Sequence, residues 1–194
     1  MVVIKKFSQL DLTKQYTYAD YLTWKFTERV ELIKGWIHLM SPAPNVSHQT
    51  VSMKLTKALL DFFDLHKCSV FAAPFDVRLY KKNIADEKVI TVIQPDLCVI
   101  CDDKKLDQRG CIGAPDLIIE IVSPGNSKRE LKTKFDLYQE NNVLEYWVVN
   151  PLEKNIQQFV LKDKKFQLVH TFFDDDKMDC KIFKGFTVTV KKIF

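Results

Sequence analysis

Two acidic residues stand inside apolar stretches that predict buried strands. Asp96 belongs to the segment Gln94–Ile100, and Glu120 belongs to the segment Pro115–Val122. An ionised carboxylate is costly to bury unless a cation, a metal or several hydrogen-bond donors compensate its charge. Two such acids on neighbouring strands indicate a site for one divalent metal ion. An alternative is that each acid ends a strand and is capped by hydrogen bonds.

The alternation of side chains along a strand tests this idea. Glu120 shares its strand face with Ile118, whereas Asp96 shares its face with Cys98, because every second residue points the same way. Both acids are therefore expected in apolar surroundings.

Two further polar residues are predicted to point inward from helices. Lys134 falls between Leu137 and Tyr138 on a helical wheel, so its stem lies along the apolar face and points towards the sheet. An alternative is that Lys134 extends its ammonium past Tyr138 to water. His48 stands three residues before Val51 and begins the inward stripe of the next helix, where its ring can reach a site or bond to backbone.

The elements that must position these residues follow from periodicity and capping. A short helix from Thr17 to Phe26, a hairpin over Glu31–Met40 turning at Lys34-Gly35, and a long helix over Val46–Leu65 come first. A helix capped by Ser127 and Glu130 runs to about Glu140. Strands are predicted at Val70–Tyr80, Gln94–Cys101, Pro115–Val122, Val143–Val149, Asn155–Leu161, Phe166–Phe173 and Phe186–Val190, with an exposed loop at Lys81–Lys88. We expect a single α+β domain over residues 1–194 with a central mixed sheet, helices on its sides and extra antiparallel strands at the C-terminus.

Composition limits the classes of protein that the chain can be. The 194 residues, 46% of them hydrophobic, are enough for one domain with a core. No apolar stretch is long enough to cross a bilayer, and Met1–Leu12 carries no signal core, so we expect a cytoplasmic protein. The five scattered cysteines predict reduced thiols, and Cys98 and Cys101 should point to opposite strand faces. The net charge of +4 permits a nucleic-acid partner, but solubility explains it equally well.

A set of motifs occurs in one order along nearly the whole chain. The motifs are Glu31-Leu-Ile-Lys-Gly35, Ser41-Pro-Ala-Pro with His48, Gln94-Pro-Asp96, Pro115-Asp-Leu-Ile-Ile-Glu120-Ile-Val-Ser-Pro124, Lys134-x-x-x-Tyr138, Glu145-Tyr-Trp-Val-Val-Asn-Pro151 and Gly185-Phe-Thr-Val-Thr-Val. Together they resemble the Uma-two family of putative restriction endonucleases, part of the PD-(D/E)XK nuclease superfamily. The resemblance implies a restriction-endonuclease-like fold.

The resemblance also implies a role for each site residue. Asp96 and Glu120 match the two acidic ligands, with the Ile121 carbonyl as a third oxygen for Mg²⁺ or Mn²⁺. Glu31 would take a metal-bound water or orient a neighbouring ligand. The superfamily lysine normally stands two residues after the second acid, where this chain has Val122, and Lys134 matches a lysine that has moved to the following helix. His48 would contact phosphate, assist acid–base chemistry or orient Glu31.

Three functions follow as alternatives. The first is a metal-dependent nuclease that hydrolyses DNA, and many nucleases of this fold pair two sites in a homodimer. The second is a non-catalytic nucleic-acid-binding or regulatory module on the same scaffold, favoured by Val122. The third is a structural protein whose acids are merely capped. Trp24, Trp36 and Trp147 are predicted to be core or interface residues, although an exposed Trp36 could stack on a base.

Overall fold

Two six-stranded sheets form the body of the protein in a computed structural model, which describes residues 3–40, 45–80, 84–123 and 128–194. The larger sheet has the strand order β12 (Lys165–Phe173), β11 (Asn155–Lys162), β10 (Glu145–Asn150), β9 (Leu117–Ile121), β6 (Leu97–Ile100) and β3 (Ser69–Ala72). Only β9 and β10 pair in parallel, so the sheet is mixed. All five residues of β9 are buried, as expected for a central strand covered on both faces.

The second sheet is smaller in area because most of its strands are short. Its order is β2 (Trp36–Leu39), β1 (Val30–Ile33), β5 (Val92–Ile93), β4 (Val77–Arg78), β8 (Gly110–Ile112) and β7 (Leu106–Asp107). The β1–β2 hairpin turns at Lys34 and Gly35, which both have positive φ angles, and such angles are what a two-residue hairpin turn needs.

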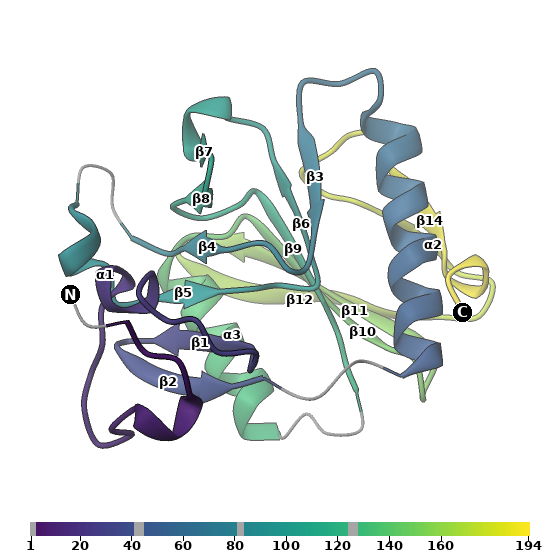
Figure 1. The fold of residues 1–194 in the computed structure, drawn as a ribbon. Helices are drawn as coiled ribbons and strands as arrows, with labels where there is room; N and C mark the ends of the chain where they lie inside the picture. The colour runs from purple at the N-terminus through teal and green to yellow at the C-terminus, as the bar shows by residue number, and fades with distance from the viewer. Residues whose placement is uncertain (1–2, 41–44, 81–83, 124–127) are drawn as a thin grey trace.

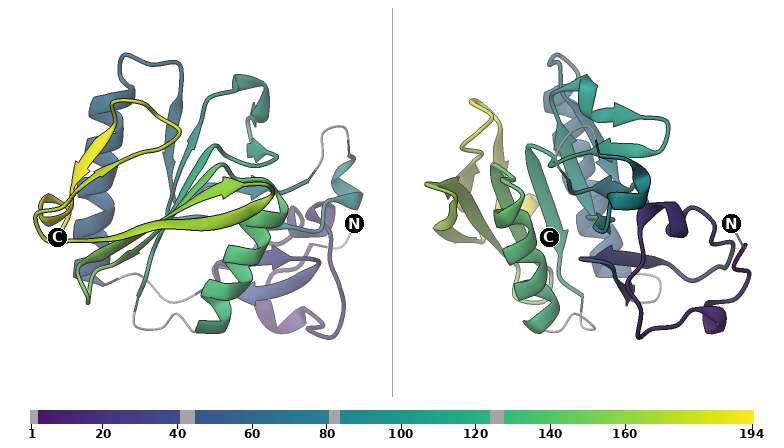
Figure 2. Two further views of the ribbon diagram at one scale, coloured as in Figure 1. Left: turned by 180° about the vertical axis from the view of Figure 1, so that it is seen from behind. Right: turned by 90° about the vertical axis from the view of Figure 1, so that its left-hand side faces the viewer.

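Each face of the larger sheet has its own core. Helix α2 (Val46–Phe63) packs its buried stripe of Val51, Leu55 and Leu59 against one face, together with β13 (Lys177–Asp179) and β14 (Thr187–Thr189). Helix α3 (Lys128–Glu140) and part of the second sheet cover the other face. Figure 1 shows α2 running beside β3 and β14 on one side, and α3 close to the β1–β2 hairpin on the other. The two views of Figure 2 also show α2 and α3 on different sides of the larger sheet.

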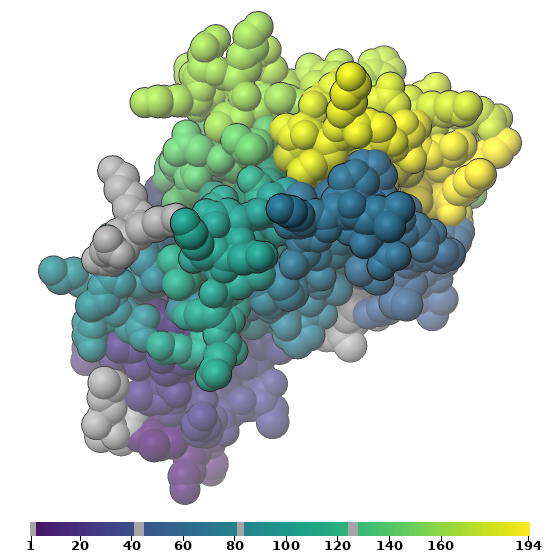
Figure 3. Space-filling view, turned by 90° about the horizontal axis from the view of Figure 1, so that it is seen from above, coloured from purple at the N-terminus to yellow at the C-terminus, as the bar shows by residue number. Residues whose placement is uncertain are grey.

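The remaining elements are short. They are α1 (Tyr18–Tyr21) and the 3₁₀ turns Phe7–Gln9, Asp86–Lys88, Asp103–Lys105 and Val190–Lys192. Thr17 caps α1 as the sequence indicates, but the helix ends five residues earlier than Phe26. The N-terminal and C-terminal segments lie at opposite ends of the molecule, as the purple and yellow atoms of Figure 3 show.

Most of the predicted elements are confirmed. The hairpin, the long helix, the strand that carries Glu120 and the three strands after Asn150 all lie where they were expected. The α+β class with a mixed sheet and added C-terminal antiparallel strands is also confirmed. The capping role of Ser127 and the motif beginning at Ser41 lie outside the described residues, as does part of the Lys81–Lys88 loop.

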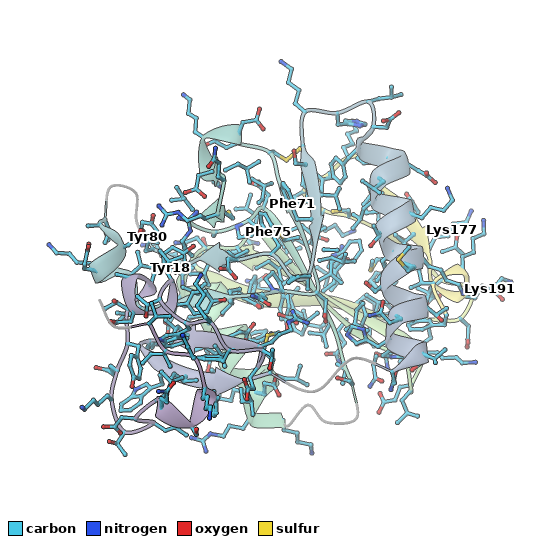
Figure 4. The ribbon with its side chains drawn as sticks, in the orientation of Figure 1. Tyr18, Phe71, Phe75, Tyr80, Lys177 and Lys191 are labelled. Carbon is cyan, nitrogen blue, oxygen red and sulfur yellow. A yellow bond between two sulfur atoms is a disulfide. The ribbon has the colours of Figure 1, made fainter. Side chains whose placement is uncertain are left out.

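The prediction of one strand over Val70–Tyr80 is wrong. The segment forms β3 in the larger sheet and β4 in the second sheet, with Pro74 between them. Proline cannot donate a ladder hydrogen bond, so the chain leaves the first sheet at this point. Phe71 and Phe75 stack across the break with ring centroids 4.1 Å apart, as the labelled side chains of Figure 4 show.

Two predictions about single residues also need correction. Pro95 separates β5 from β6, so Asp96 stands immediately before β6 rather than inside a strand.

The prediction that all five thiols are reduced is wrong for Cys68 and Cys101, which form a disulfide bond. These cysteines flank the paired residues Ser69 and Ile100 of two antiparallel strands and therefore face each other. The other three cysteines are free and buried. The thiols therefore lend no support to a reducing compartment, and the cytoplasmic location stays a prediction.

The helices among the described residues include none that is long and apolar enough to span a membrane.

Replacing Gly110 by alanine should destabilise the fold more than the same change at Gly113. Both glycines have positive φ angles, which cost an alanine about 1–2 kcal/mol. A Cβ at Gly110 would also lie 2.2 Å from the Asp76 carbonyl oxygen, whereas at Gly113 its nearest contact is 3.7 Å away. We expect Gly110→Ala to lower the free energy of unfolding by a further 1–3 kcal/mol or so. Urea denaturation of both variants, followed by circular dichroism, tests this expectation, and equal losses would contradict it.

Candidate active site

Three carboxylates from separate parts of the chain line one cleft of about 750 Å³. Glu31 comes from β1, Asp96 from the residue before β6, and Glu120 from β9. Because Leu97 pairs with Ile119 in antiparallel strands, Asp96 and Glu120 stand at the same level and on the same face of the larger sheet. Glu31 and Glu120 are buried, with 4% and 7% of their surface exposed.

Lys134 joins two of these carboxylates. Its Nζ lies 3.0 Å from Oε1 of Glu120 and 3.3 Å from Oε1 of Glu31. Only 6% of Lys134 is exposed, so its ammonium points towards the sheet and does not extend past Tyr138 to water. The Tyr138 hydroxyl, one helical turn after Lys134, donates a hydrogen bond to the same oxygen of Glu120. Helix α3 therefore supplies Glu120 with two donors from one face.

Backbone donors hold the other two carboxylates. The N–H of Gln94 donates to Oε1 of Glu31 at 2.8 Å. The N–H of Ile121 donates to Oδ2 of Asp96 at 2.8 Å. These bonds tie Glu31 to the residue after β5 and Asp96 to β9. The other oxygen of each carboxylate takes no part in its backbone bond.

His48 approaches Asp96 from the first turn of α2. Its Nε2 lies 3.3 Å from Oδ1 of Asp96, and its Nδ1 is buried without a hydrogen-bond partner among the described residues. Asn45 caps the helix by accepting the N–H of His48, which fixes the position of this residue. His48 is therefore a neighbour of Asp96 and begins the inward stripe of α2, as predicted.

The pKa values of the cluster show that its charges are strongly coupled. Burial raises the pKa of Glu120 to about 7; the Lys134 ammonium lowers it, and the charges of Asp96 and Glu31 raise it. Burial lowers the pKa of Lys134, but the Glu120 and Glu31 carboxylates outweigh burial and hold it well above its usual range. Burial likewise lowers the pKa of His48, and the hydrogen bond and charge of Asp96 raise it by more.

The donor set fits a hard divalent cation. Three carboxylates share the cleft with the Lys134 ammonium, so negative charge is in excess there, and burial together with this charge makes Glu120 hard to ionise. Mg²⁺ usually binds to one or two carboxylates and completes its shell with water, rather than sitting in a cage of protein ligands. Among the described residues, no group of three or more His, Cys, Asp or Glu side chains is arranged so that it could hold a metal ion by itself.

Other candidates lie outside the site. Asp116 does not line the cleft, and its Oδ2 accepts the N–H of Cys101. Cys98 and Cys101 pack into different cores and thus point to opposite faces, as predicted.

Two residues near the acids have no role predicted from the sequence. Tyr138 stands four residues after Lys134, so a helical wheel places it beside the lysine and could have identified it. Gln94 holds Glu31 only through its backbone, and no property of its side chain signals that contact.

The mixed sheet with helices on its faces and the acidic cleft define a nuclease-like fold, and comparisons with known proteins agree. Residues 18–191 match the family described as putative restriction endonuclease, and the chain belongs to this family, the Uma-two family. An uncharacterised protein, slr1290 of Synechocystis sp., is 22% identical over 165 residues, which are 84% of this chain and 83% of that protein. The crystal structure of a putative nuclease belonging to DUF820 from Anabaena variabilis is similar in fold, with a TM-score of 0.71 and 18% identity. The similarity covers 92% of this chain and 97% of that chain.

Replacing Lys134 by methionine should destabilise the protein by about 3–5 kcal/mol, because Glu31 and Glu120 would remain buried without their cation. Lys132→Met is the matched control, since Lys132 lies on the same helix with its side chain 75% exposed and should cost less than about 1 kcal/mol. Urea denaturation measures both. Adding Glu120→Gln to Lys134→Met should recover part of the loss, and a double variant with simply additive losses would contradict the ion pair.

The metal-free protein should lose stability as the pH rises. The pKa of Glu120 is raised from 4.5 to about 7, so its contribution is fully present below about pH 4.5 and is lost as the pH passes through about 7. The raised pKa of His48 acts in the same direction. Measured in EDTA between about pH 5 and pH 8, the free energy of unfolding should fall by up to roughly 3 kcal/mol more in the wild type than in Glu120→Gln. Parallel pH profiles would contradict this assignment.

Proposed function

We propose that the protein is an endonuclease that hydrolyses DNA phosphodiester bonds with the help of Mg²⁺ or Mn²⁺. The observation that carries this proposal is the position of Lys134, whose ammonium lies against Glu120 and Glu31 in the acidic cleft. A nuclease of this class needs a cation beside its two acidic ligands, and the strand position that usually supplies it holds Val122. Membership of the Uma-two family supports the same reaction class.

The residues proposed to hold the metal are Asp96, Glu120 and the carbonyl of Ile121. Their oxygens are the hard donors that Mg²⁺ and Mn²⁺ prefer. Glu31 would accept a water of the ion's shell or keep a neighbouring ligand oriented, because its Oε1 already accepts from Gln94 and Lys134. When bound, the metal would neutralise charge on the scissile phosphate and lower the pKa of the attacking water.

The protein groups would share the remaining tasks. The Lys134 ammonium can donate to a phosphate oxygen and stabilise the negative charge that grows there in the transition state. Glu31 and Glu120 hold this ammonium in place, and Tyr138 fixes the carboxylate of Glu120. His48 orients Asp96 through Oδ1, while the Ile121 N–H holds Oδ2. Both oxygens of Asp96 are thus in protein contacts, as is Oε1 of Glu31 and of Glu120, and these contacts limit the rotation of the carboxylates.

A second candidate function is a nucleic-acid-binding module without turnover. Its supporting observation is that Lys134 already pairs with two carboxylates, so the lysine could serve only to compensate buried acids. Such a module would bind DNA with a strong dependence on salt and leave the strand intact.

Conservative replacement of either metal ligand should abolish cutting. Asp96→Asn and Glu120→Gln are each expected to lower the rate of plasmid cleavage in Mg²⁺ or Mn²⁺ by at least about 100-fold, because each removes a charged ligand. Asp64→Asn, at an exposed carboxylate after α2, is the control and should cut like the wild type. EDTA should stop cleavage and added Mn²⁺ should restore it. Cutting that needs no metal and survives both substitutions would refute the proposal.

A further inference from the structure

Trp36 is unlike the other two tryptophans of the chain. The ring of Trp24 packs against three aromatic side chains, and the buried ring of Trp147 stacks on Phe186. Trp36 is 43% exposed and makes no ring contact among the described residues. An apolar ring of this size is costly to leave in water and is free to receive a flat ligand.

The register of the hairpin places this ring on the side of the active site. Glu31 pairs with His38 and Ile33 pairs with Trp36, so these four side chains project from one face of the β1–β2 hairpin. All four line the cleft that contains the carboxylates. Trp36 lies two residues along β2 from His38, which is about 7 Å from the level of Glu31. The exposed ring therefore lies within the reach of one or two nucleotides from the proposed reaction centre.

Arg29 lies at the other end of the same face. Its Nε and one terminal nitrogen lie 3.3 and 2.8 Å from Oε1 of Gln94, whose amide nitrogen in turn donates to Asp76 at 2.8 Å. The guanidinium is thus oriented by a neutral amide, and it forms no ion pair with a carboxylate among the described residues. By contrast, Arg78 and Arg109 are each paired with an aspartate. A positioned guanidinium whose charge is not neutralised is suited to a phosphate.

We propose that the β1–β2 hairpin binds single-stranded DNA, with one base stacked on Trp36 and a backbone phosphate on Arg29. The inference rests on the proposed function, because it assigns the form of DNA that enters the same cleft. Arg29, the residue before β1, and Ile33, which pairs with Trp36, are four residues or about 13 Å apart along extended chain, and Glu31 lies between them. A ring can stack only on a base whose face is open, which favours an unpaired strand over a closed duplex.

Binding without cleavage tests this proposal separately from nuclease activity. The full-length protein is titrated in EDTA against a fluorescein-labelled oligo-dT of about 20 nucleotides and against a blunt duplex of the same length, with fluorescence anisotropy as the readout. The wild type should bind the single strand more tightly. Trp36→Ala should weaken that binding about tenfold, and Trp36→Phe should restore part of it. Phe173→Ala is the matched control, since Phe173 is 45% exposed and does not line the cleft, and it should bind like the wild type.

Salt dependence tests the phosphate contact. Arg29→Gln should weaken binding and reduce the slope of log K against log salt by about 0.7, the value for one phosphate contact on a single strand. Arg109→Gln, at an exposed arginine outside the cleft, should leave the slope unchanged. Equal affinity of Trp36→Ala and wild type, or tighter binding of the duplex, would overturn the inference. Tight single-strand binding without metal-dependent cutting would instead support the inference and refute the nuclease.

Discussion

The contact of the Lys134 ammonium with Glu31 and Glu120 is the interaction on which the rest of the site depends. It joins strand β1 of the second sheet to two consecutive elements much later in the chain, strand β9 of the larger sheet and helix α3. Burying three charges gains little net stability over a well-packed apolar core, because desolvation offsets most of the attraction. Removing the ammonium, however, leaves two buried carboxylates without a counter-charge in a medium of low dielectric constant. The contact therefore constrains which residues these positions can hold.

The charge balance of the cluster bears on the proposed metal ion. Asp96 adds a third carboxylate beside this pair, and His48 compensates it only when its ring is protonated. Burial is the main cause of the raised pKa of Glu120; the Lys134 ammonium lowers this pKa, and the charges of Asp96 and Glu31 raise it. A divalent ion bound by Asp96 and Glu120 would relieve this repulsion, so metal affinity and the cost of burial have the same origin. Lys134 alone cannot balance the site, because one ammonium is shared between two acids.

Local sequence signals were sufficient for the parts of the site that lie on regular elements. Alternation along a strand correctly placed Glu120 on the face that α3 covers, and a helical wheel correctly turned Lys134 towards the sheet. The capping and turn chemistry of Thr17 and Gly35 was equally local. These predictions succeed because a period of 2 or 3.6 residues determines side-chain direction within one element.

Features that depend on pairing between distant segments could not be predicted in the same way. Strands of two residues such as β4 and β5 are too short to show alternation, so the sequence does not predict the second sheet. The disulfide of Cys68 with Cys101 follows only from the register of β3 with β6 across 33 positions. The Arg29 contact with Gln94 likewise joins residues 65 positions apart through side chains. In each case the deciding contact is tertiary, and one sequence gives no local trace of it.

Lys134 stands on α3 and not on the strand that carries Glu120, and this affects how the site is built. A lysine at position 122 would rise from the same strand as Glu120, and its ammonium would be fixed by the sheet alone. Position 122, the residue after β9, holds an apolar valine, and Lys134 reaches Glu120 from α3, with Tyr138 beside it on the next turn. Lys134 and Tyr138 both contact Glu120 and both stand on α3, so the position of this helix sets the ammonium and the hydroxyl together. Because Lys134 also contacts Glu31, the same helix sets the position of the β1–β2 hairpin over the cleft. The geometry of the carboxylates and the placement of Trp36 on that hairpin are thus linked through Lys134, and the Lys34–Glu140 ion pair adds a second contact between the hairpin and α3.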